Sequence, residues 1–302
     1  MSLSPSLSER IYGCTLCRAC EEVCPSGVDF FKLSVAVRER IAREGKIPTE
    51  FAQLAERIRD LGRPFLEAKV LVTSPPKGDL LLFLGCMVRY RLPELLDSAV
   101  RVLRSIGQQP TWLLEEQCCG GFLEHLGFPE AAHEQAERAA KALSSSDRQV
   151  VFLCPACYLT LRDYLPDALH ITEFLADYRD QLPLQSLPAR IAVHDPCHLG
   201  RYAGIYDAPR LLAKTIPGAE LVELPRSREK SRCCGGPLRL VHPELAAPMA
   251  DRTVEEAVAW EVTHLVTSCP TCYYSLRTSA YLFENVTAAY ITQLLSDLLS
   301  LN

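Results

Sequence analysis

The sequence lacks any hydrophobic run long enough to cross a membrane. The longest such run, Leu80 to Val88, is about half the length of a spanning helix. The opening residues, MSLSPSLSER, also lack the apolar stretch of a signal peptide. From these two absences we expect a cytoplasmic protein.

Clusters of positive charge and nucleotide-binding glycine motifs are absent as well. The 302 residues carry a net charge of −5, with Lys and Arg scattered, which gives no electrostatic footprint for nucleic acid. Neither a G-x-G-x-x-G motif after a predicted strand nor a G-x-x-x-x-G-K-[ST] motif occurs. A flavin, if one is used, is therefore expected on a partner protein.

Cysteine, in contrast, is abundant. The chain has 14 cysteines, and every one falls in one of three groups. In a reducing compartment this number favours metal or redox chemistry over disulfide bonds. The composition of the whole chain, 48% hydrophobic and 23% charged residues, is that of a globular protein with two or three domains.

The first group is a C-x2-C-x2-C-x3-C-P run formed by Cys14, Cys17, Cys20 and Cys24. This run is typical of the [4Fe-4S] sites of bacterial ferredoxins and fits a zinc knuckle less well. In two-cluster ferredoxins the fourth cysteine binds the other cluster, but no second run exists here. Two roles therefore stay open for Cys24. It completes the same cluster, or it serves a cluster whose other ligands come from another subunit.

The other ten cysteines form an internal duplication, which we call the first and second copy. The residue numbers of the two copies differ by 115, except for the leading cysteine, where the difference is 111. The first copy consists of Cys86, Cys118, Cys119, Cys154 and Cys157, and the second of Cys197, Cys233, Cys234, Cys269 and Cys272.

Five thiols in each copy exceed the four that a zinc ion or a cubane cluster takes. We therefore expect each copy to hold a larger or more irregular iron-sulfur cluster. Gly120 and Gly235 follow the paired cysteines and leave room for the backbone to approach such a group, so we predict that they contact the cofactor.

The pattern of apolar residues predicts an α/β protein. Two helices, within 31–41 and 51–61, form a small helical domain over residues 1–66. After it, short apolar runs that read as buried parallel strands alternate with helices. The expected strands cover 80–84, 150–153, 191–193, 221–224 and 265–267, and the helices 95–106, 129–143, 209–215 and 243–259. We predict one domain per copy, 67–186 and 187–302.

Several cysteines follow the predicted strands directly, which places them at the carboxyl ends of parallel sheets. Ligands bind at that edge in open parallel sheets, so each copy is expected to hold one cluster there. In each copy a threonine, Thr172 or Thr292, follows the last short strand and is expected to cap the next helix.

The C…CCG…CPxC arrangement, with the segment HDPCHLGR at 194–201, resembles the cysteine-rich CCG-domain proteins. These include catalytic subunits of heterodisulfide reductases and iron-sulfur subunits of glycolate, lactate and glycerol-3-phosphate oxidoreductases. The resemblance covers nearly the whole chain and implies two non-cubane [4Fe-4S] clusters, one per copy, beside the cubane cluster of the N-terminal run. Zinc in one copy is the alternative, as in a related succinate dehydrogenase subunit. Related fused proteins usually carry two ferredoxin runs, and this chain has one.

The surroundings of the cysteines differ between the copies. His194 and His198 flank Cys197, and Arg232 precedes Cys233, whereas the neighbours of Cys86 are apolar. Proton-coupled chemistry favours the second copy, so His194, His198 and Arg232 are the candidate catalytic residues. Each has a simpler alternative: the histidines orient metal ligands, and the arginine compensates cluster charge.

Two functions remain open. In the first, the chain is a subunit that passes electrons from the N-terminal cluster to the non-cubane clusters, where a small disulfide or thiol reacts. In the second, it only transfers electrons for a flavin-dependent 2-hydroxyacid or glycerol-3-phosphate dehydrogenase. In both, the expected partners are a flavoprotein or a ferredoxin-type subunit. A structural zinc module does not need so many cysteines.

Overall fold

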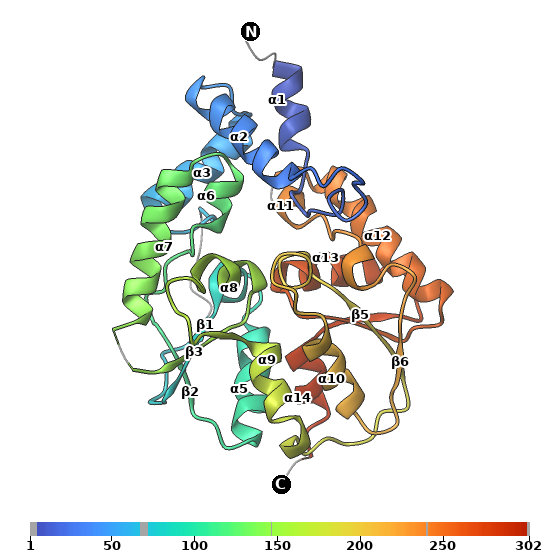
Figure 1. Cartoon of the computed structure of the whole chain (residues 1–302). Helices are drawn as coiled ribbons and strands as arrows, with labels where there is room; N and C mark the ends of the chain where they lie inside the picture. Colours follow the sequence, from blue (N-terminus) through green and yellow to red (C-terminus); the bar gives the residue numbers. More distant parts are fainter. Residues whose placement is uncertain (1–4, 67–71, 146, 240, 301–302) are drawn as a thin grey trace.

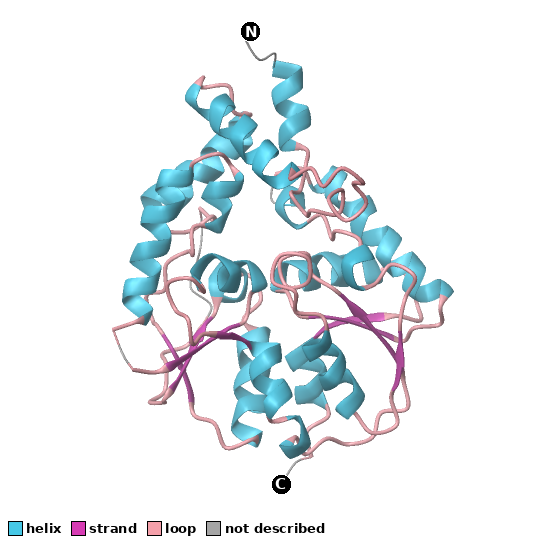
Figure 2. Ribbon diagram, in the orientation of Figure 1, coloured by secondary structure: helices cyan, strands magenta, loops and turns pink. Residues whose placement is uncertain are grey.

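The computed structural model describes residues 5–66, 72–145, 147–239 and 241–300. It consists of two parallel four-stranded sheets with helices on their faces and a helical N-terminal part above both (Figures 1 and 2). The predicted α/β class with two repeated units is thus confirmed. Within the described residues, none of the helices combines the length and apolar content needed to cross a bilayer.

The first copy forms the first sheet. Its strands lie in the order β2-β1-β3-β4 and are all parallel. Their bounds are β1 Leu80–Phe83, β2 Pro110–Trp112, β3 Gln149–Phe152 and β4 Leu169–His170. The accompanying helices are α4 Gly85–Tyr90, α5 Glu94–Ser105, α6 Gly121–His125, α7 Pro129–Leu143, α8 Pro155–Leu161 and α9 Ile171–Asp177.

The second copy repeats this topology as β6-β5-β7-β8. Its strands are β5 Arg190–His194, β6 Glu220–Val222, β7 His264–Thr267 and β8 Thr287–Tyr290. Its helices are α10 Asp207–Thr215, α11 Gly236–Arg239, α12 Pro243–Ala259, α13 Pro270–Ala280 and α14 Ile291–Asp297. Single 3-10 turns cover Arg179–Gln181 and Arg228–Lys230. The strand order of the duplication is therefore preserved along with its cysteine spacing.

Four helices join the two copies. Helix α5 packs on α14, and α9 packs on α10 (Figure 1). A hydrogen bond of 2.8 Å between the Ser98 and Thr292 hydroxyls crosses this contact, and one apolar core with members from both copies, such as Leu95 and Leu295, fills it. Since burial of each such side chain contributes about 1.5–3 kcal/mol, the two copies are held together by a large shared core.

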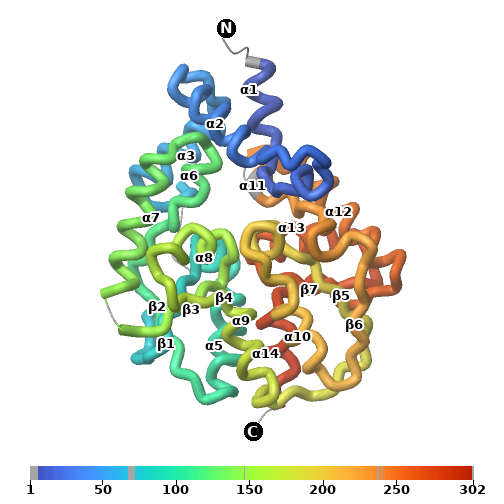
Figure 3. The backbone as a smooth tube through the Cα atoms, viewed as in Figure 1, coloured from blue at the N-terminus to red at the C-terminus, as the bar shows by residue number. Residues whose placement is uncertain are grey.

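The N-terminal part consists of α1 Pro5–Tyr12, α2 Phe30–Arg43 and α3 Thr49–Leu61. Its core residues Ile41 and Phe51 belong to one apolar cluster with Leu123 of α6 and Ala246 of α12. The helices therefore rest on both copies at once, as the backbone tube in Figure 3 shows. The domain division at 66 and 186 stays a prediction, because apolar cores extend across both boundaries.

The predicted threonine caps are wrong. His170 is the N-cap of α9, because its side chain accepts a hydrogen bond from the Thr172 amide, and Tyr290 holds the same place before α14. Thr172 and Thr292 are buried in the first turns of these helices. Sequence analysis also missed strand β2 and the helices α1, α4, α6, α8, α11 and α13.

Candidate metal centre and active site

The strand order brings the cysteines to one edge of each sheet. β1 pairs with β2 on one side and with β3 on the other, so the chain reverses direction across the sheet between β1 and β3. Ligands bind at such switch points. Cys86 follows β1 and Cys154 follows β3, and their counterparts follow β5 and β7 in the same way.

Local sequence explains how the CPxC segments end the strands. Cys154 and Cys269 are N-caps with extended backbone, and a proline occupies the first position of the helix that follows. Proline favours this position because its fixed φ suits a helix and its missing N–H is not needed there. The second cysteine, Cys157 or Cys272, lies in the first turn of the same helix.

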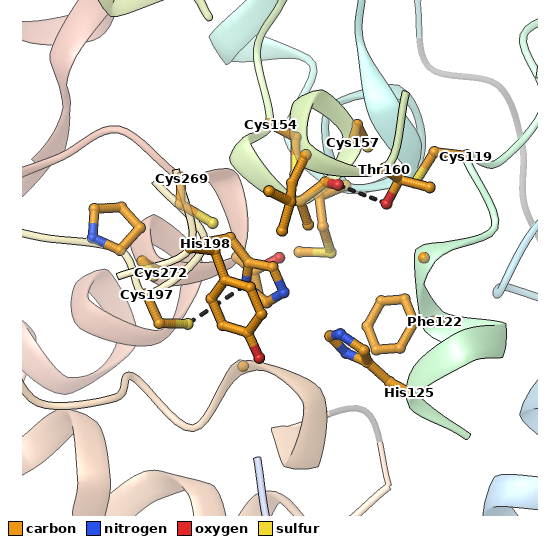
Figure 4. Close-up of a pocket in the computed structure, with 18 of the residues that line it drawn as sticks. Cys119, Phe122, His125, Cys154, Cys157, Thr160, Cys197, His198, Cys269 and Cys272 are labelled. Carbon is orange, nitrogen blue, oxygen red and sulfur yellow. Dashed lines mark hydrogen bonds between the residues drawn. The ribbon is translucent and has the colours of Figure 1, made fainter. Parts of the chain in front are cut away.

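All ten cysteines of the two copies line a single cavity of about 200 Å³. Eight of them are buried, and Cys86 and Cys197 are half-buried. Figure 4 shows thiols from both copies pointing toward the same space. We expected one cluster site at the edge of each copy, and the structure brings the two edges together.

Contacts between thiols extend within and between the copies. The Cys272 thiol donates to the Cys234 sulfur at 3.1 Å. The thiols of Cys154 and Cys269, one from each copy, lie close enough to interact. The cavity is therefore continuous across the boundary of the duplication.

Gly120 and Gly235, the glycines directly after the paired cysteines, lie at tight turns of the backbone. Gly120 and Gly235 have φ of +86° and +75°, and a Cβ at either would come within 3 Å of the backbone of α7 or α12. It is the next glycine of each pair, Gly121 or Gly236, that lines the cavity. A Cβ on Gly121 would lie 2.6 Å from the Thr160 hydroxyl. Gly120 and Gly235 thus make the turn, and their contact with a cofactor stays a prediction.

The N-terminal cysteine run lies on the second copy. It occupies the loop between α1 and α2, and the Cys17 thiol lies close enough to Cys233 to interact with it. Arg201 donates to the Cys17 carbonyl at 2.6 Å and to the Ser231 carbonyl at 2.7 Å, and the Tyr202 hydroxyl donates to the Leu16 carbonyl. Cys14 and Cys20 are exposed. The run is thus open to a partner on one side and touches the second copy on the other.

His198, a predicted catalytic residue, lines the cavity. Its Nδ1 lies 3.4 Å from the Cys197 sulfur, and its ring stacks on Tyr202 with 4.8 Å between centroids and 7° between planes. Tyr202 thus fixes the orientation of the imidazole, and Figure 4 shows the contact with Cys197 as a dashed line.

A second histidine, His125, was missed by sequence analysis. It lies at the end of α6, lines the cavity, and its ring centroid is 5.3 Å from that of His198. Burial lowers the pKa of His125 well below its usual range, with the positive charges of His198 and Arg38 adding to the effect. No repeated motif points to this residue, because position 240, its counterpart in the second copy, is leucine.

Arg38 connects this histidine with the N-terminal run. The buried guanidinium donates to the backbone carbonyls of His125 at 2.7 Å, Ile11 at 2.8 Å and Cys14 at 2.5 Å. One side chain of α2 therefore fixes both the first cysteine of the run and the histidine at the cavity.

The other two candidate catalytic residues lie outside the cavity lining. His194 ends β5 and is buried, and that burial lowers its pKa. Arg232 forms an ion pair of 3.5 Å with Glu256 of α12. Their catalytic roles stay predictions that this arrangement does not support directly.

Buried carboxylates hold the loops before the leading cysteines. Glu116 accepts the amides of Leu84 at 2.8 Å and Gly85 at 2.7 Å, and burial, opposed by these bonds, raises its pKa to about 7. In the second copy Asp195 forms a two-bond ion pair with Arg210 at 2.6 and 3.0 Å. Sequence analysis singled out neither Glu116 nor Arg210.

The donor chemistry of the cavity fits iron-sulfur clusters. Its possible ligands are overwhelmingly cysteine sulfurs, which such clusters require. No group of three or more His, Cys, Asp or Glu residues in the described part of the chain is arranged to hold one metal ion. The ten cysteine sulfurs that line the cavity exceed the four ligands that a zinc ion takes, so their number fits a multi-iron group.

Comparison with known proteins places both copies in one family. Residues 80–162 and 191–277, together more than half of the chain, match the sequence profile of a cysteine-rich domain abbreviated CCG. One component of the dihydromethanophenazine:CoB–CoM heterodisulfide reductase of Methanosarcina mazei is 32% identical over 88% of this chain and 72% of its own length.

Two other relatives are named for different oxidoreductase reactions. One component of the fumarate reductase (CoM/CoB) of Methanothermobacter marburgensis is 30% identical over 90% of this chain and 58% of its own length. The EtfAB:quinone oxidoreductase of Syntrophomonas wolfei is 27% identical over 88% of this chain and 43% of its own length. A crystal structure of a hypothetical protein from Helicobacter pylori has the same fold, with a TM-score of 0.66 at 11% identity over 99% of this chain and 65% of that one.

Proposed function

Because this chain belongs to the family of cysteine-rich CCG-domain proteins, we propose that it delivers electrons to a thiol-disulfide reaction in the cavity between its two copies. The chain is related to iron-sulfur components of oxidoreductase complexes, including one from a heterodisulfide reductase. The observation that carries the proposal is the single cavity lined by all ten cysteines of the duplication. If each copy held a cluster that only relayed electrons, the cysteines of the two copies would not need to line the same cavity.

The residues that would hold the cofactors follow from the three cysteine groups. The four N-terminal cysteines would hold a [4Fe-4S] cubane cluster, and the five cysteines of each copy a non-cubane cluster. When bound, these clusters supply one-electron transfer. The exposure of Cys14 and Cys20 fits the arrival of electrons from a flavoprotein or ferredoxin-type partner, and the contact between Cys17 and Cys233 fits their passage into the second copy.

The reaction consumes two electrons and two protons for each disulfide. The S–S bond breaks, both sulfurs are reduced, and two S–H bonds form. The electrons come from the partner protein. His198 donates one proton to a departing sulfur at the cavity, and water supplies the second proton. Tyr202 holds the His198 ring in place, and the apolar part of the lining, including Phe31 and Phe122, limits the access of water.

A second function is favoured by the similarity to the EtfAB:quinone oxidoreductase. In it, the chain only relays electrons between a flavoprotein and an acceptor, and no substrate enters the cavity. We propose a cytoplasmic site of action in either case.

The two functions are separated by one assay without oxygen. Reduced methyl viologen supplies electrons, bis(2-hydroxyethyl) disulfide is the substrate, and released thiol is measured. We expect two thiols per disulfide and loss of this activity in Cys269→Ser, with the spectroscopic signal of the N-terminal cluster retained. Cluster reduction by the viologen with no thiol release would contradict the proposal and support the relay function.

A further inference from the structure

A second hollow of about 430 Å³ lies beside the cysteine cavity and is rich in arginine. We call it the arginine groove. Arg57 comes from α3, Arg91 directly follows α4, and Arg239 ends α11. Three elements that are distant in the sequence thus bring three positive charges to one place. The other lining residues are Leu54, Pro64, Phe65, Leu66, Met87, Gly236, Thr271 and Tyr274.

These three charges have no acidic partner among the described residues. Neither Asp nor Glu lines the groove, and no ion pair in the described chain involves Arg57, Arg91 or Arg239. The Nε atoms of Arg57 and Arg239 are buried and lack a hydrogen-bond partner there. Arg91 lies over the Phe65 ring at 4.4 Å, which orients its guanidinium.

Unpaired guanidinium groups that lie together repel one another, and a buried donor without a partner is costly. Both costs are removed when an anion binds, because a guanidinium matches the geometry of a carboxylate, sulfonate or phosphate. Elsewhere in this chain arginines such as Arg210 and Arg277 have carboxylate partners. The groove therefore has the electrostatic properties of an anion site.

The groove adjoins the cavity directly. Met87, Gly236 and Thr271 line both spaces. An elongated molecule with its anionic end at the arginines would pass these three residues and present its other end to the thiols. Apolar contacts with Leu66 and Tyr274 are available to the carbon chain between the two ends.

We propose that the arginine groove binds the anionic end of the thiol or disulfide substrate, so that the natural substrate carries a carboxylate, sulfonate or phosphate at some distance from its sulfur. This inference rests on the proposed function, since it names the substrate class for the reaction in the cavity.

Binding is tested apart from catalysis with 3,3′-thiodipropionate, a thioether dianion that cannot be reduced. Calorimetry on the iron-loaded protein without oxygen should detect this dianion but not the uncharged 3,3′-thiodipropanol. Arg57→Gln and Arg239→Gln should each weaken binding about tenfold or more, the range for charge-assisted hydrogen bonds. Arg57→Lys should weaken it less. Arg252→Gln, at an exposed position of α12, is the matched control and should not change it.

A further measurement uses the wild-type protein and therefore does not depend on whether the variants fold. In it, inorganic sulfate should compete with the thioether dianion for binding. Equal binding of the dianion and the diol, or no competition by sulfate, would overturn the proposal. So would unchanged dianion binding in both glutamine variants, even if their cluster spectra changed, because the arginines would then only compensate cluster charge.

Steady-state kinetics with a charged and a neutral disulfide provide a second test. With 3,3′-dithiodipropionate as substrate, the glutamine variants should raise KM about tenfold with kcat little changed, and with the neutral bis(2-hydroxyethyl) disulfide they should change neither. If no disulfide is reduced but the arginines still govern thioether binding, the proposed function fails and the anion site stands. If both disulfides are reduced equally well by every variant, the anion site fails and the proposed function stands.

Discussion

Two histidine rings, His125 and His198, lie side by side at the cysteine cavity and have different electrostatic surroundings. Burial keeps the pKa of His125 low, so this ring is neutral near pH 7 and cannot donate a proton readily. His198 instead contacts the Cys197 sulfur and is stacked on Tyr202. His198 is therefore the better placed proton donor of the pair.

We expect His198→Ala to slow disulfide reduction by about 10²-fold or more, the loss typical of removing a positioned proton donor, while the iron content stays the same. Thiol release and iron analysis on the same preparation check this. His133→Ala, an exposed histidine on α7 away from the cavity, is the control and should have wild-type activity. Equal rates for the two variants would mean that His198 only orients its neighbours.

A second prediction at the residue scale concerns Arg210 and its ion pair with Asp195. Both side chains are nearly inaccessible, so removing Arg210 leaves the buried Asp195 carboxylate without a counter-charge and with the Arg228 amide as a donor. Arg210→Met should lower the free energy of unfolding by about 3–5 kcal/mol. Arg190→Met, which breaks an exposed pair with Glu220, should cost at most about 1 kcal/mol. Urea denaturation of both variants measures these free energies of unfolding. Similar losses in the two variants would contradict the prediction that the buried ion pair contributes more to stability than the exposed one.

At the scale of elements, the N-cap of α9 predicts a pH dependence. Burial lowers the pKa of His170 to about 4, whereas its ordinary value is 6.5. As pH falls through this window, the unfolded chain takes up a proton that the folded protein does not bind, so the folded state loses stability. Relative to His170→Asn, whose cap does not titrate, the wild type should lose about 2 kcal/mol between pH 7 and 5. Parallel pH profiles of unfolding for the two proteins would contradict this.

Some of the helices and strands could be predicted from the sequence and others could not. The strands and most helices were predictable because short apolar runs and long amphipathic stretches alternate, and the bounds of α7 and α12 agree with the prediction. β2 was missed because Pro110–Trp112 is only three residues long and begins with proline. The cap at His170 was missed because imidazole is not among the usual capping side chains.

The candidate site was predictable where its members share a motif and unpredictable where they come from different parts of the chain. The fourteen cysteines were recognisable from spacing alone. That ten of them line one cavity depends on how α5 and α9 pack on the second copy, which no local pattern encodes. His125 and the arginine groove depend on the same long-range packing.

For the whole molecule, three complete cysteine groups predict iron at about 12 atoms per chain when the protein is isolated without oxygen. Metal analysis with electron paramagnetic resonance checks the number and types of cluster. About 4 iron with one or two zinc per chain would contradict two non-cubane clusters and favour zinc in the copies.

Cys24→Ser distinguishes the two roles of that residue in the same measurement. A loss of about four iron from the chain purified alone would mean that Cys24 completes the N-terminal cluster. Full iron content with weakened assembly would mean that Cys24 supplies a ligand to a cluster shared with a partner.

The paired contacts between the copies have an evolutionary consequence. Helix α10 is the counterpart of α5, and α14 is the counterpart of α9, so the two contacts α5 with α14 and α9 with α10 are the same contact made twice. Reciprocal contacts of this kind are those of an isologous dimer with twofold symmetry. An ancestor with one CCG unit could have formed the cysteine cavity only by pairing with an identical chain, and gene fusion then freed each half to diverge. His125 has Leu240 as its counterpart and His198 has Met87, and a symmetric homodimer could not have evolved such differences between its halves.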